Sequence, residues 1–345
     1  MKRSLLLALV GTIVSSAMGV VYAQDVHLFQ FYETPLMRNP ALAGIYTGDV
    51  RIQAAYRNQW QSTGVPYKTT ILSGEYKFGV GQGDDFLTVG FNMFHDIAGS
   101  SRLTTIQFMP AVNFHKSLDA ERNRYLSLGF MGGMVQRQFD NKNLTFDNQY
   151  TSRGYDPFAP SGEQFSGLQR TIADFAVGLS YNSQLGEYGN YFLGASLWHF
   201  NKPTERFVLE EVQLAPKWQF NGGIRTPVSE TVEIHAEVNY LLQDSYTELL
   251  AGGYASYVFS DATDRDNGMQ RMAVSLGAFV RLNDAVIPVA RMEYNNFALG
   301  FSYDINTSQL RTASQGRGGY ELTMSYRGFT HGDNSTLDAV RCPRF

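Results

Sequence analysis

Along much of the chain, apolar and polar residues alternate with a period of two. The segment from residue 319 to 327 shows this without interruption. Its apolar members are Tyr320, Leu322, Met324 and Tyr326, and the polar residues between and after them are Glu321, Thr323, Ser325 and Arg327. Successive side chains of a strand point to opposite faces, so this segment is predicted to be a strand with one apolar and one polar face.

Similar segments recur from residue 48 onward and predict fourteen strands. Their ranges are 48–57, 67–79, 85–95, 102–116, 124–138, 170–183, 189–199, 212–226, 230–243, 246–260, 270–283, 285–294, 296–305 and 319–327. In 232–243 the alternation has one exception, at Leu241. A soluble β-sandwich would bury the apolar faces against each other. Here, however, the apolar faces are rich in Tyr, Phe and Leu, and the other face of each strand is rich in charged residues. This combination favours a lipid-facing exterior and a hydrated lumen.

These patterns predict an all-β fold, a transmembrane antiparallel β-barrel of the bacterial outer membrane with about 14 strands. The 20 Tyr and 24 Phe residues suit the aromatic girdles of such barrels. The lone cysteine, Cys342, cannot form an internal disulfide, so packing and hydrogen bonds must stabilise the chain.

The first 23 residues have the pattern of an export signal. Lys2 and Arg3 are followed by an apolar run over 5–21, and Ala23 ends a typical cleavage site. We therefore expect a cleaved signal peptide over 1–23 and a mature chain that begins at Gln24. An uncleaved membrane helix is the alternative, which the shortness of the apolar run disfavours. Without Lys2 and Arg3, 26 of the 28 basic residues remain against 32 acidic ones, a formal charge of −6, and no basic nucleic-acid footprint is present.

The residues between the signal and the first strand are predicted to be ordered. Asn39-Pro40 begins a turn, because proline restricts its own φ and that of the preceding residue, and Gly44 permits a reversal. We expect residues 24–47 to form a periplasmic or lumen-entering segment. The barrel is expected over 48–327, and a periplasmic C-terminal tail over 328–345.

An even number of strands places both barrel ends on the periplasmic side. The long connections 139–169, 201–211 and 306–318 then face outward, while 185–188, 228–230 and 295–296 form periplasmic turns. One connection, 260–269, is long for a periplasmic turn.

Four short motifs spread over the mature chain carry a family resemblance. They are Gln30-Phe31-Tyr32, the run Asn39-Pro40-Ala41-Leu42-Ala43-Gly44, the run Tyr56-Arg57-Asn58-Gln59-Trp60, and the tail Cys342-Pro343-Arg344-Phe345. Further matches lie at 143–149 and at Asp174-Phe175. In these motifs the chain resembles the PorP/SprF family of outer-membrane proteins of the type IX secretion and gliding apparatus.

The resemblance implies a non-enzymatic barrel in the outer membrane of a Gram-negative bacterium. Family members act as partner or anchor for secreted cell-surface proteins, such as adhesins with a C-terminal sorting domain. They also link the secretion machinery to periplasmic, peptidoglycan-associated proteins. The expected partners are therefore these proteins and outer-membrane lipid. The polar inner face by itself suggests an alternative, a porin-like channel or transporter for small solutes.

The motif residues have two possible roles. They could hold the barrel's shape, or they could bind a partner. In the run from Tyr56 to Trp60, the aromatic rings can lie at a membrane interface while Arg57 and Gln59 form hydrogen bonds to backbone or lumen acceptors. Aromatic residues in the longest external connection, Tyr155, Phe158 and Phe165, form a candidate partner loop, since exposed aromatic groups favour interfaces. The alternative is that they fold back as a lid over the lumen.

Neither a catalytic group nor a metal or cofactor site is predicted. The six histidines are scattered without metal-binding spacing. His235 alternates with Glu233 and Glu237, a pattern that could bind a cation but that equally fits a polar row facing the lumen. The acidic stretch 261–268 lacks the glutamate that a calcium loop requires at its twelfth position.

Overall fold

A computed structural model of the chain describes residues 28–60, 65–81, 84–119, 124–140, 144–152, 154–163, 167–186, 188–205, 212–260, 271–308 and 316–330. The predicted signal peptide, residues 24–27, Phe165 and the motif Cys342-Pro343-Arg344-Phe345 lie outside the described residues.

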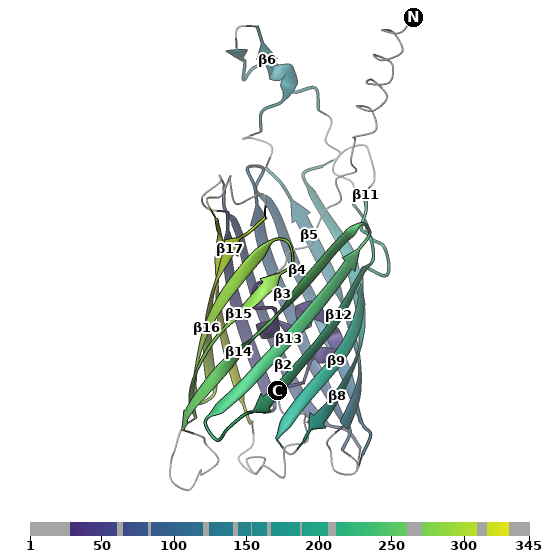
Figure 1. The fold of residues 1–345 in the computed structure, drawn as a ribbon. Coiled ribbons are helices and arrows are strands. Elements are labelled where there is room, and N and C mark those ends of the chain that lie inside the picture. Colours follow the sequence, from purple (N-terminus) through teal and green to yellow (C-terminus); the bar gives the residue numbers. More distant parts are fainter. Residues whose placement is uncertain are drawn as a thin grey trace, which may run out of the picture.

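Within the described residues, fourteen long antiparallel strands close into one barrel (Figure 1), which confirms the predicted fold class. They are β1 (Val50–Gln59), β2 (Tyr67–Gly79), β3 (Phe86–Ala98), β4 (Leu103–Ser117), β5 (Arg124–Gln138), β8 (Gln169–Leu185), β9 (Gly189–Trp198), β12 (Lys217–Pro227), β13 (Val232–Gln243), β14 (Tyr246–Ser260), β15 (Met272–Arg281), β16 (Ala285–Tyr294), β17 (Phe297–Asn306) and β18 (Arg317–Gly328). Each strand pairs with the next along the chain, and β18 pairs with β1 to close the ring.

A 3₁₀ turn and two short hairpins lie at one end of the barrel, which we call the upper end. The 3₁₀ turn η3 (Asp147–Gln149) leads into the hairpin β6 (Tyr150–Thr151) and β7 (Gly154–Tyr155), which rises above the rim in Figure 1. A second hairpin joins β10 (Thr204–Glu205) to β11 (Val212–Gln213). The predicted strand 212–226 was therefore wrong at its start, because Val212 and Gln213 pair with β10 and the barrel strand begins only at Lys217.

The antiparallel order sorts the connections between the two ends. The pairs β5–β8, β9–β12 and β17–β18 are joined at the upper end, and the short turns β8–β9, β12–β13 and β16–β17 lie at the lower end. The first and last residues of the barrel, Val50 and Gly328, are register partners at the lower end. Which end faces the outside of the cell stays a prediction.

Alternation along the strands separates an apolar outer surface from a polar interior. In β13, Val238 is 40% exposed on the outside, whereas the next residue, Asn239, is only 6% exposed and points inward. In β18, Leu322 and Met324 are likewise exposed, while Glu321 is fully buried. Leu241, the exception to the alternation in the sequence, points into the barrel and is buried. The strand therefore continues regularly at this position, and an apolar residue simply replaces a polar one on its inward face.

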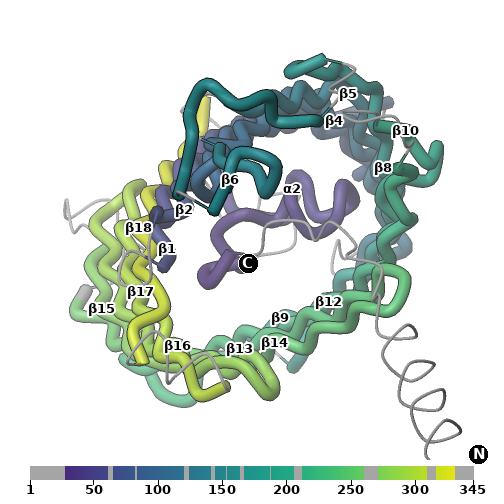
Figure 2. Tube along the Cα trace, turned by 90° about the horizontal axis from the view of Figure 1, so that it is seen from above, coloured from purple at the N-terminus to yellow at the C-terminus, as the bar shows by residue number. Residues whose placement is uncertain are grey.

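Residues 28–48, which we call the plug segment, lie inside the barrel. Figure 2 shows this part of the chain, in purple, crossing the ring of strands. It contains three short helical turns, η1 (Phe31–Glu33), α2 (Pro35–Arg38) and η2 (Pro40–Leu42), and almost every residue in it is buried. Among the described residues, no helix is both long enough and apolar enough to cross a membrane.

Apolar side chains of the plug segment pack onto inward-facing residues of the strands. Phe29 and Phe31 join a cluster with Phe279 of β15 and Ile287 of β16, and the rings of Phe31 and Phe279 meet edge to face at 5.3 Å. Leu36 packs with Met109, Met131 and Trp198 on the opposite wall. The segment thus gives the barrel an apolar core that its strands lack by themselves.

Candidate functional site: the plug segment and the chamber above it

The Asn39-Pro40-Ala41 turn rests on three inward-facing glycines of neighbouring strands. They are Gly129 of β5, Gly178 of β8 and Gly194 of β9, and the first two are register partners. A Cβ atom on Gly129 would overlap the backbone of Pro40 and Ala41, and one on Gly178 would overlap the side-chain oxygen of Asn39. Close approach of two backbones therefore requires glycine at these positions.

Asn39 links the turn to the barrel wall. Its Oδ1 accepts a hydrogen bond from the backbone N–H of Ala41 at 2.8 Å, which caps η2, and Pro40 occupies the first position of that turn. Its Nδ2 donates to the carbonyl oxygens of Leu179 at 3.2 Å and Ala195 at 3.3 Å. One amide thus satisfies both the turn and the strand backbones.

The carbonyl groups that follow are held by the same wall, from β4 and β8. Asn113 donates from Nδ2 to the carbonyl oxygens of Ala41 at 2.9 Å and Ala43 at 2.8 Å, and Ser180 donates to that of Ala41 at 2.8 Å. Nε2 of His115 lies within hydrogen-bond distance of Nδ2 of Asn113, at 3.0 Å, and Nδ1 of His115 lies 2.7 Å from the hydroxyl of Ser127. This buried histidine is thus part of the cradle for the plug segment.

Gly44 makes the reversal that the sequence predicted, with a φ of +83°. Its N–H donates to Oε2 of Glu75 at 2.7 Å, and the same carboxylate forms a buried ion pair with Arg51 at 2.7 Å. Arg51 lies over the ring of Tyr46 at 4.4 Å, and Lys77 donates to the carbonyl oxygen of Tyr46 at 2.5 Å. Charge-assisted hydrogen bonds therefore fix the lower end of the plug segment.

At the other end of the segment, Gln30 is bound to β18. The carboxylate of Glu321 accepts the backbone N–H groups of Phe29 and Gln30, each at 2.8 Å. The side-chain amide of Gln30 donates to the carbonyl oxygen of Glu321 at 3.1 Å and accepts from the hydroxyl of Thr323 at 2.9 Å. Gly300 of β17 leaves the room that this amide occupies.

Two ion pairs tie the middle of the segment to the barrel. Glu33 pairs with Arg291 of β16 at 2.7 Å, and Arg291 also contacts Glu293. Arg38 pairs with Glu237 of β13 at 2.7 Å. Removing one partner of such a buried pair leaves an uncompensated charge, which typically costs about 3–5 kcal/mol.

The Tyr56-Arg57-Asn58-Gln59-Trp60 run is divided between the two faces of β1. Tyr56 faces outward near Tyr320 of β18, with ring centroids 6.3 Å apart. Arg57 points inward and its guanidinium stacks on the Phe29 ring at 4.2 Å, while Gln59 is buried at the upper end of the strand. Trp60 packs edge-on against Tyr67 at 4.7 Å. The inward half of this motif therefore contacts the plug segment.

The structure brings Gln30, the 39–44 run and Arg57 together in the lumen. The candidate partner loop is separate from them, at the upper end, where Phe158 is 93% exposed and Tyr155 is half exposed. Sequence reasoning missed the residues that bind the plug segment, chiefly Glu75, Glu237, Arg291 and Glu321. These residues could have been found as charged residues on the inward faces of predicted barrel strands, because a buried charge needs a partner.

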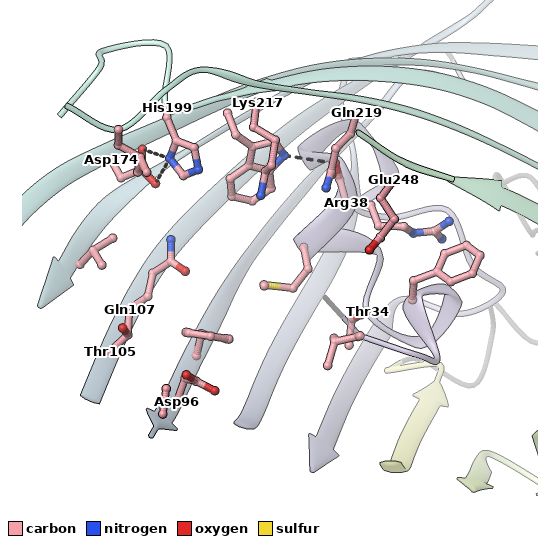
Figure 3. Close-up of a pocket in the computed structure, with 18 of the residues that line it drawn as sticks. Thr34, Arg38, Asp96, Thr105, Gln107, Asp174, His199, Lys217, Gln219 and Glu248 are labelled. Carbon is pink, nitrogen blue, oxygen red and sulfur yellow. Dashed lines mark hydrogen bonds and ion pairs between the residues drawn. The ribbon is translucent and has the colours of Figure 1, made fainter. Parts of the chain in front are cut away.

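A cavity of about 220 Å³, which we call the upper chamber, lies between the plug segment and the upper rim (Figure 3). Phe31, Thr34 and Arg38 of the plug segment line it from one side. Its charged lining includes Asp174, which lies 2.9 Å from Nδ1 of His199, and Lys217, whose ammonium lies over the Trp198 ring at 5.0 Å.

A smaller cavity of about 60 Å³ lies on the lower side of the plug segment. His235 lines this cavity. The neighbouring Glu233 forms ion pairs with Arg225 at 2.7 Å and Arg271 at 3.2 Å. The row of Glu233, His235 and Glu237 is therefore part of a network of ion pairs. Within the described part of the chain, no group of three or more His, Cys, Asp or Glu residues is placed to hold a metal ion.

The fold and the filled lumen define a class of protein, an outer-membrane β-barrel with an internal plug. The sequence identifies the family: the chain matches the model of the type IX secretion system membrane proteins PorP/SprF over residues 20–326 and belongs to that family. Among curated proteins, none matches the chain.

Several solved outer-membrane barrels have a similar fold. The toluene transporter TbuX of Ralstonia pickettii is 11% identical, with 89% of this chain and 95% of that chain covered and a TM-score of 0.50. The translocator domain of the autotransporter NalP from Neisseria meningitidis is 13% identical, with 81% and 88% covered and a TM-score of 0.42. A FadL homologue of Pseudomonas aeruginosa is 10% identical, with 84% and 92% covered and a TM-score of 0.40. At such identities the similarity concerns the fold alone.

Proposed function

We propose that this protein is a plugged, non-enzymatic barrel of the type IX secretion or gliding apparatus. It acts as partner or anchor for secreted cell-surface proteins that carry a C-terminal sorting domain, and it links the machinery to periplasmic components. The observation that carries the proposal is the fixation of the plug segment. Hydrogen bonds and ion pairs hold it from Phe29 to Tyr46 against strands all around the barrel.

Such fixation favours an anchor over an open pore. A segment that must leave the lumen to allow solute flux would have to break the buried pairs Glu33–Arg291 and Arg38–Glu237 and the two bonds to Glu321 together. Breaking any of these contacts would leave a buried charge or polar group without its partner. A rigid filled barrel instead offers its two ends as surfaces for other proteins.

The β6–β7 hairpin and the residues that follow it to position 163, which we call the upper hairpin, form the surface that we assign to the secreted partner. The rings of Tyr150 and Tyr155 lie 5.4 Å apart on it, and Phe158 is almost fully exposed. Exposed aromatic side chains are enriched at the centres of protein interfaces. We expect Phe165 of the same connection to contribute.

A porin-like channel is the second candidate. Cavities remain on both sides of the plug segment, and a barrel of similar fold, TbuX, is described as a toluene transporter. In this alternative the plug segment would move during transport.

Purification from native membranes in mild detergent tests the proposal. The intact protein should bring down a large exported protein with a C-terminal sorting domain, a periplasmic peptidoglycan-binding protein, or both. Deleting residues 154–163 should weaken the contact with the exported protein and leave the barrel folded, because β6 and β7 do not pair with the barrel strands. As a matched control, Tyr240→Phe on the lipid face should leave both contacts unchanged.

The same preparation distinguishes the channel. Reconstituted into planar bilayers, a plugged anchor should show no steady conductance. A protein that purifies alone and conducts ions steadily would contradict the anchor and support the channel.

A further inference from the structure

Arginines outnumber carboxylates around the cavity of about 60 Å³ below the plug segment, which we call the lower cavity. The described residues that line it include five arginines, Arg38, Arg51, Arg225, Arg291 and Arg327. The carboxylates of the same lining are those of three residues, Glu33, Glu237 and Glu293. The lining therefore has a surplus of positive charge.

The surplus remains when the ion-pair partners just outside the lining are added. Glu75 pairs with Arg51, and Glu233 pairs with both Arg225 and Arg271. Among the described residues, the network then contains six arginines and five glutamates. It carries one positive charge more than it carries negative charges, and an excess charge in a largely buried site is destabilising unless a counter-charge is supplied.

Two of these arginines are direct register partners. Arg51 of β1 and Arg327 of β18 lie opposite each other at the seam that closes the barrel, and both line the lower cavity. The other charged register pairs of β1, Arg51 with Glu75 and Arg57 with Glu321, join opposite charges. Like charges directly opposite each other destabilise a sheet, so the arginine pair at the seam favours the presence of a negative group beside it.

The surplus charge lies close to the lower rim and is within reach of a ligand. Arg327 immediately precedes Gly328, the last residue of the barrel, and its side chain is only half-buried. The side chains of Arg225 and Arg271 are 21% and 20% exposed. A buried water needs about 10–15 Å³ of space, so the lower cavity has room for a group of the size of a carboxylate.

We propose that the lower cavity binds a carboxylate group of a polypeptide, with the guanidinium of Arg327 as its principal contact. A guanidinium presents its N–H donors in a planar fork that matches the two oxygens of a carboxylate. One excess positive charge matches a single carboxylate better than it matches a phosphate, which carries about −1.5 to −2.

Two sources can supply this carboxylate. One is a periplasmic protein, in which case the inference rests on the proposed function and assigns the periplasmic link a site within the barrel. The other is this chain itself, because residues 331–345 follow β18 and include Asp333 and Asp338. The chemistry at Arg327 is the same in both cases.

Calorimetry with the purified, folded full-length protein in detergent, at one low salt concentration, tests the site. The probe is the capped peptide acetyl-Gly-Glu-Gly-amide, compared with acetyl-Gly-Gln-Gly-amide, which has nearly the same shape without the charge, and with inorganic phosphate. It is added to the wild type and to the double variant Asp333→Asn/Asp338→Asn. We expect saturable binding of the glutamate peptide to the double variant, with binding of the glutamine peptide weaker by about tenfold or more, because hydrogen bonds between charged groups are the stronger ones.

Arg327→Gln, made in the double variant, should weaken binding of the glutamate peptide by about tenfold or more, whereas Arg327→Lys, which keeps the charge but not the fork, should retain part of the affinity. The matched control is Arg137→Gln, which removes an arginine that lines the upper chamber and pairs with Glu205. It should change the affinity by less than about twofold, since it lies outside the lower cavity. If Arg327→Gln does not fold, the comparison of the two peptides still decides, because it is made with Arg327 in place.

The two sources give different results. If the wild type binds the glutamate peptide at least about tenfold more weakly than the double variant, the chain's own acidic residues fill the site; equal affinities assign the carboxylate to another protein. Several results would overturn the inference: no saturable binding to either protein, equal affinity for the two peptides, tighter binding of phosphate, or an equal loss in Arg327→Gln and Arg137→Gln.

The outcome is separable from that of the proposed function. A periplasmic protein that co-purifies equally with the wild type and with Arg327→Gln refutes the lower cavity as its binding site and leaves the anchor role intact. Binding of the glutamate peptide through Arg327 without any co-purifying protein refutes the anchor role and leaves the carboxylate site intact.

Discussion

Asn39 in the plug segment lies against the backbone of Gly178 in β8, with its side-chain oxygen in the space that a side chain on Gly178 would need. The amide of Asn39 also bonds to the carbonyl oxygens of Leu179 and Ala195, so the contact joins the plug segment to two strands at once. The turn and the glycine wall therefore form one packing unit.

Replacing Gly178 by valine should displace the plug segment. Overpacking a filled site typically costs about 1–3 kcal/mol, and here it also breaks the bonds of Asn39. We expect a lower urea midpoint of the folded band on unheated gels. The control is Gly222→Ala on the outer face of β12, where the nearest atom to a new Cβ is the end of the flexible Leu193 side chain at 3.1 Å. Equal loss in both variants would contradict the close-packed turn.

Glu321→Gln should release the start of the plug segment. The carboxylate accepts two backbone N–H groups, and an amide can accept only one of them while it presents its own N–H₂ to the other. Hydrogen bonds to a charged group are worth about 1.5–3 kcal/mol. Hydrogen exchange of the Phe29 and Gln30 amides should therefore accelerate at least tenfold. Ser325→Ala, four residues further along the same strand and on the same inward face, should leave this exchange unchanged.

The outer face is tested by a pair of adjacent substitutions. Val238 is exposed on the outside of β13, and an arginine at the middle of a lipid-facing barrel strand costs about 2–4 kcal/mol. Asn239→Arg points into the barrel, where the polar upper chamber accommodates it better. Folding into lipid vesicles should thus be reduced far more by Val238→Arg than by Asn239→Arg. Similar yields for both would refute the assignment of faces.

The orientation in the membrane is tested by thiol labelling in a Cys342→Ser background. Ser161→Cys lies in the upper connection between β5 and β8, and Ser229→Cys lies in the lower turn between β12 and β13. An impermeant maleimide added to intact cells should label the first and not the second. The reverse pattern would mean that the upper end faces the periplasm.

The strands were predictable because their signal is local. Alternation in 297–304 and 319–327 depends only on each residue's neighbours and on the period of two, and the structure places β17 and β18 there. Locality also explains the error at residues 212–213. Their apolar and polar residues suit a strand, but whether a strand joins the barrel or a small hairpin depends on a partner elsewhere in the chain.

The candidate site was only partly predictable. Gln30, the Asn39 to Gly44 run and Arg57 stood out as motif residues, and proline and glycine indicated an ordered turn. Their contacts to Glu321, Glu75 and the glycine wall could not be derived, because Gln30 and Glu321 are 291 positions apart.

The sequence by itself thus determined which residues form strands, which face of each strand meets lipid, and that the segment before them is ordered. These properties follow from side-chain chemistry and backbone preferences over a few residues. Only the tertiary structure decided that the segment fills the lumen and that Leu241 belongs to the inside. The same holds for the upper chamber, which the plug segment encloses together with side chains from β3, β5 and β9. These features depend on closing the ring of strands, which brings inward side chains from distant parts of the chain around a single segment and removes them from water together.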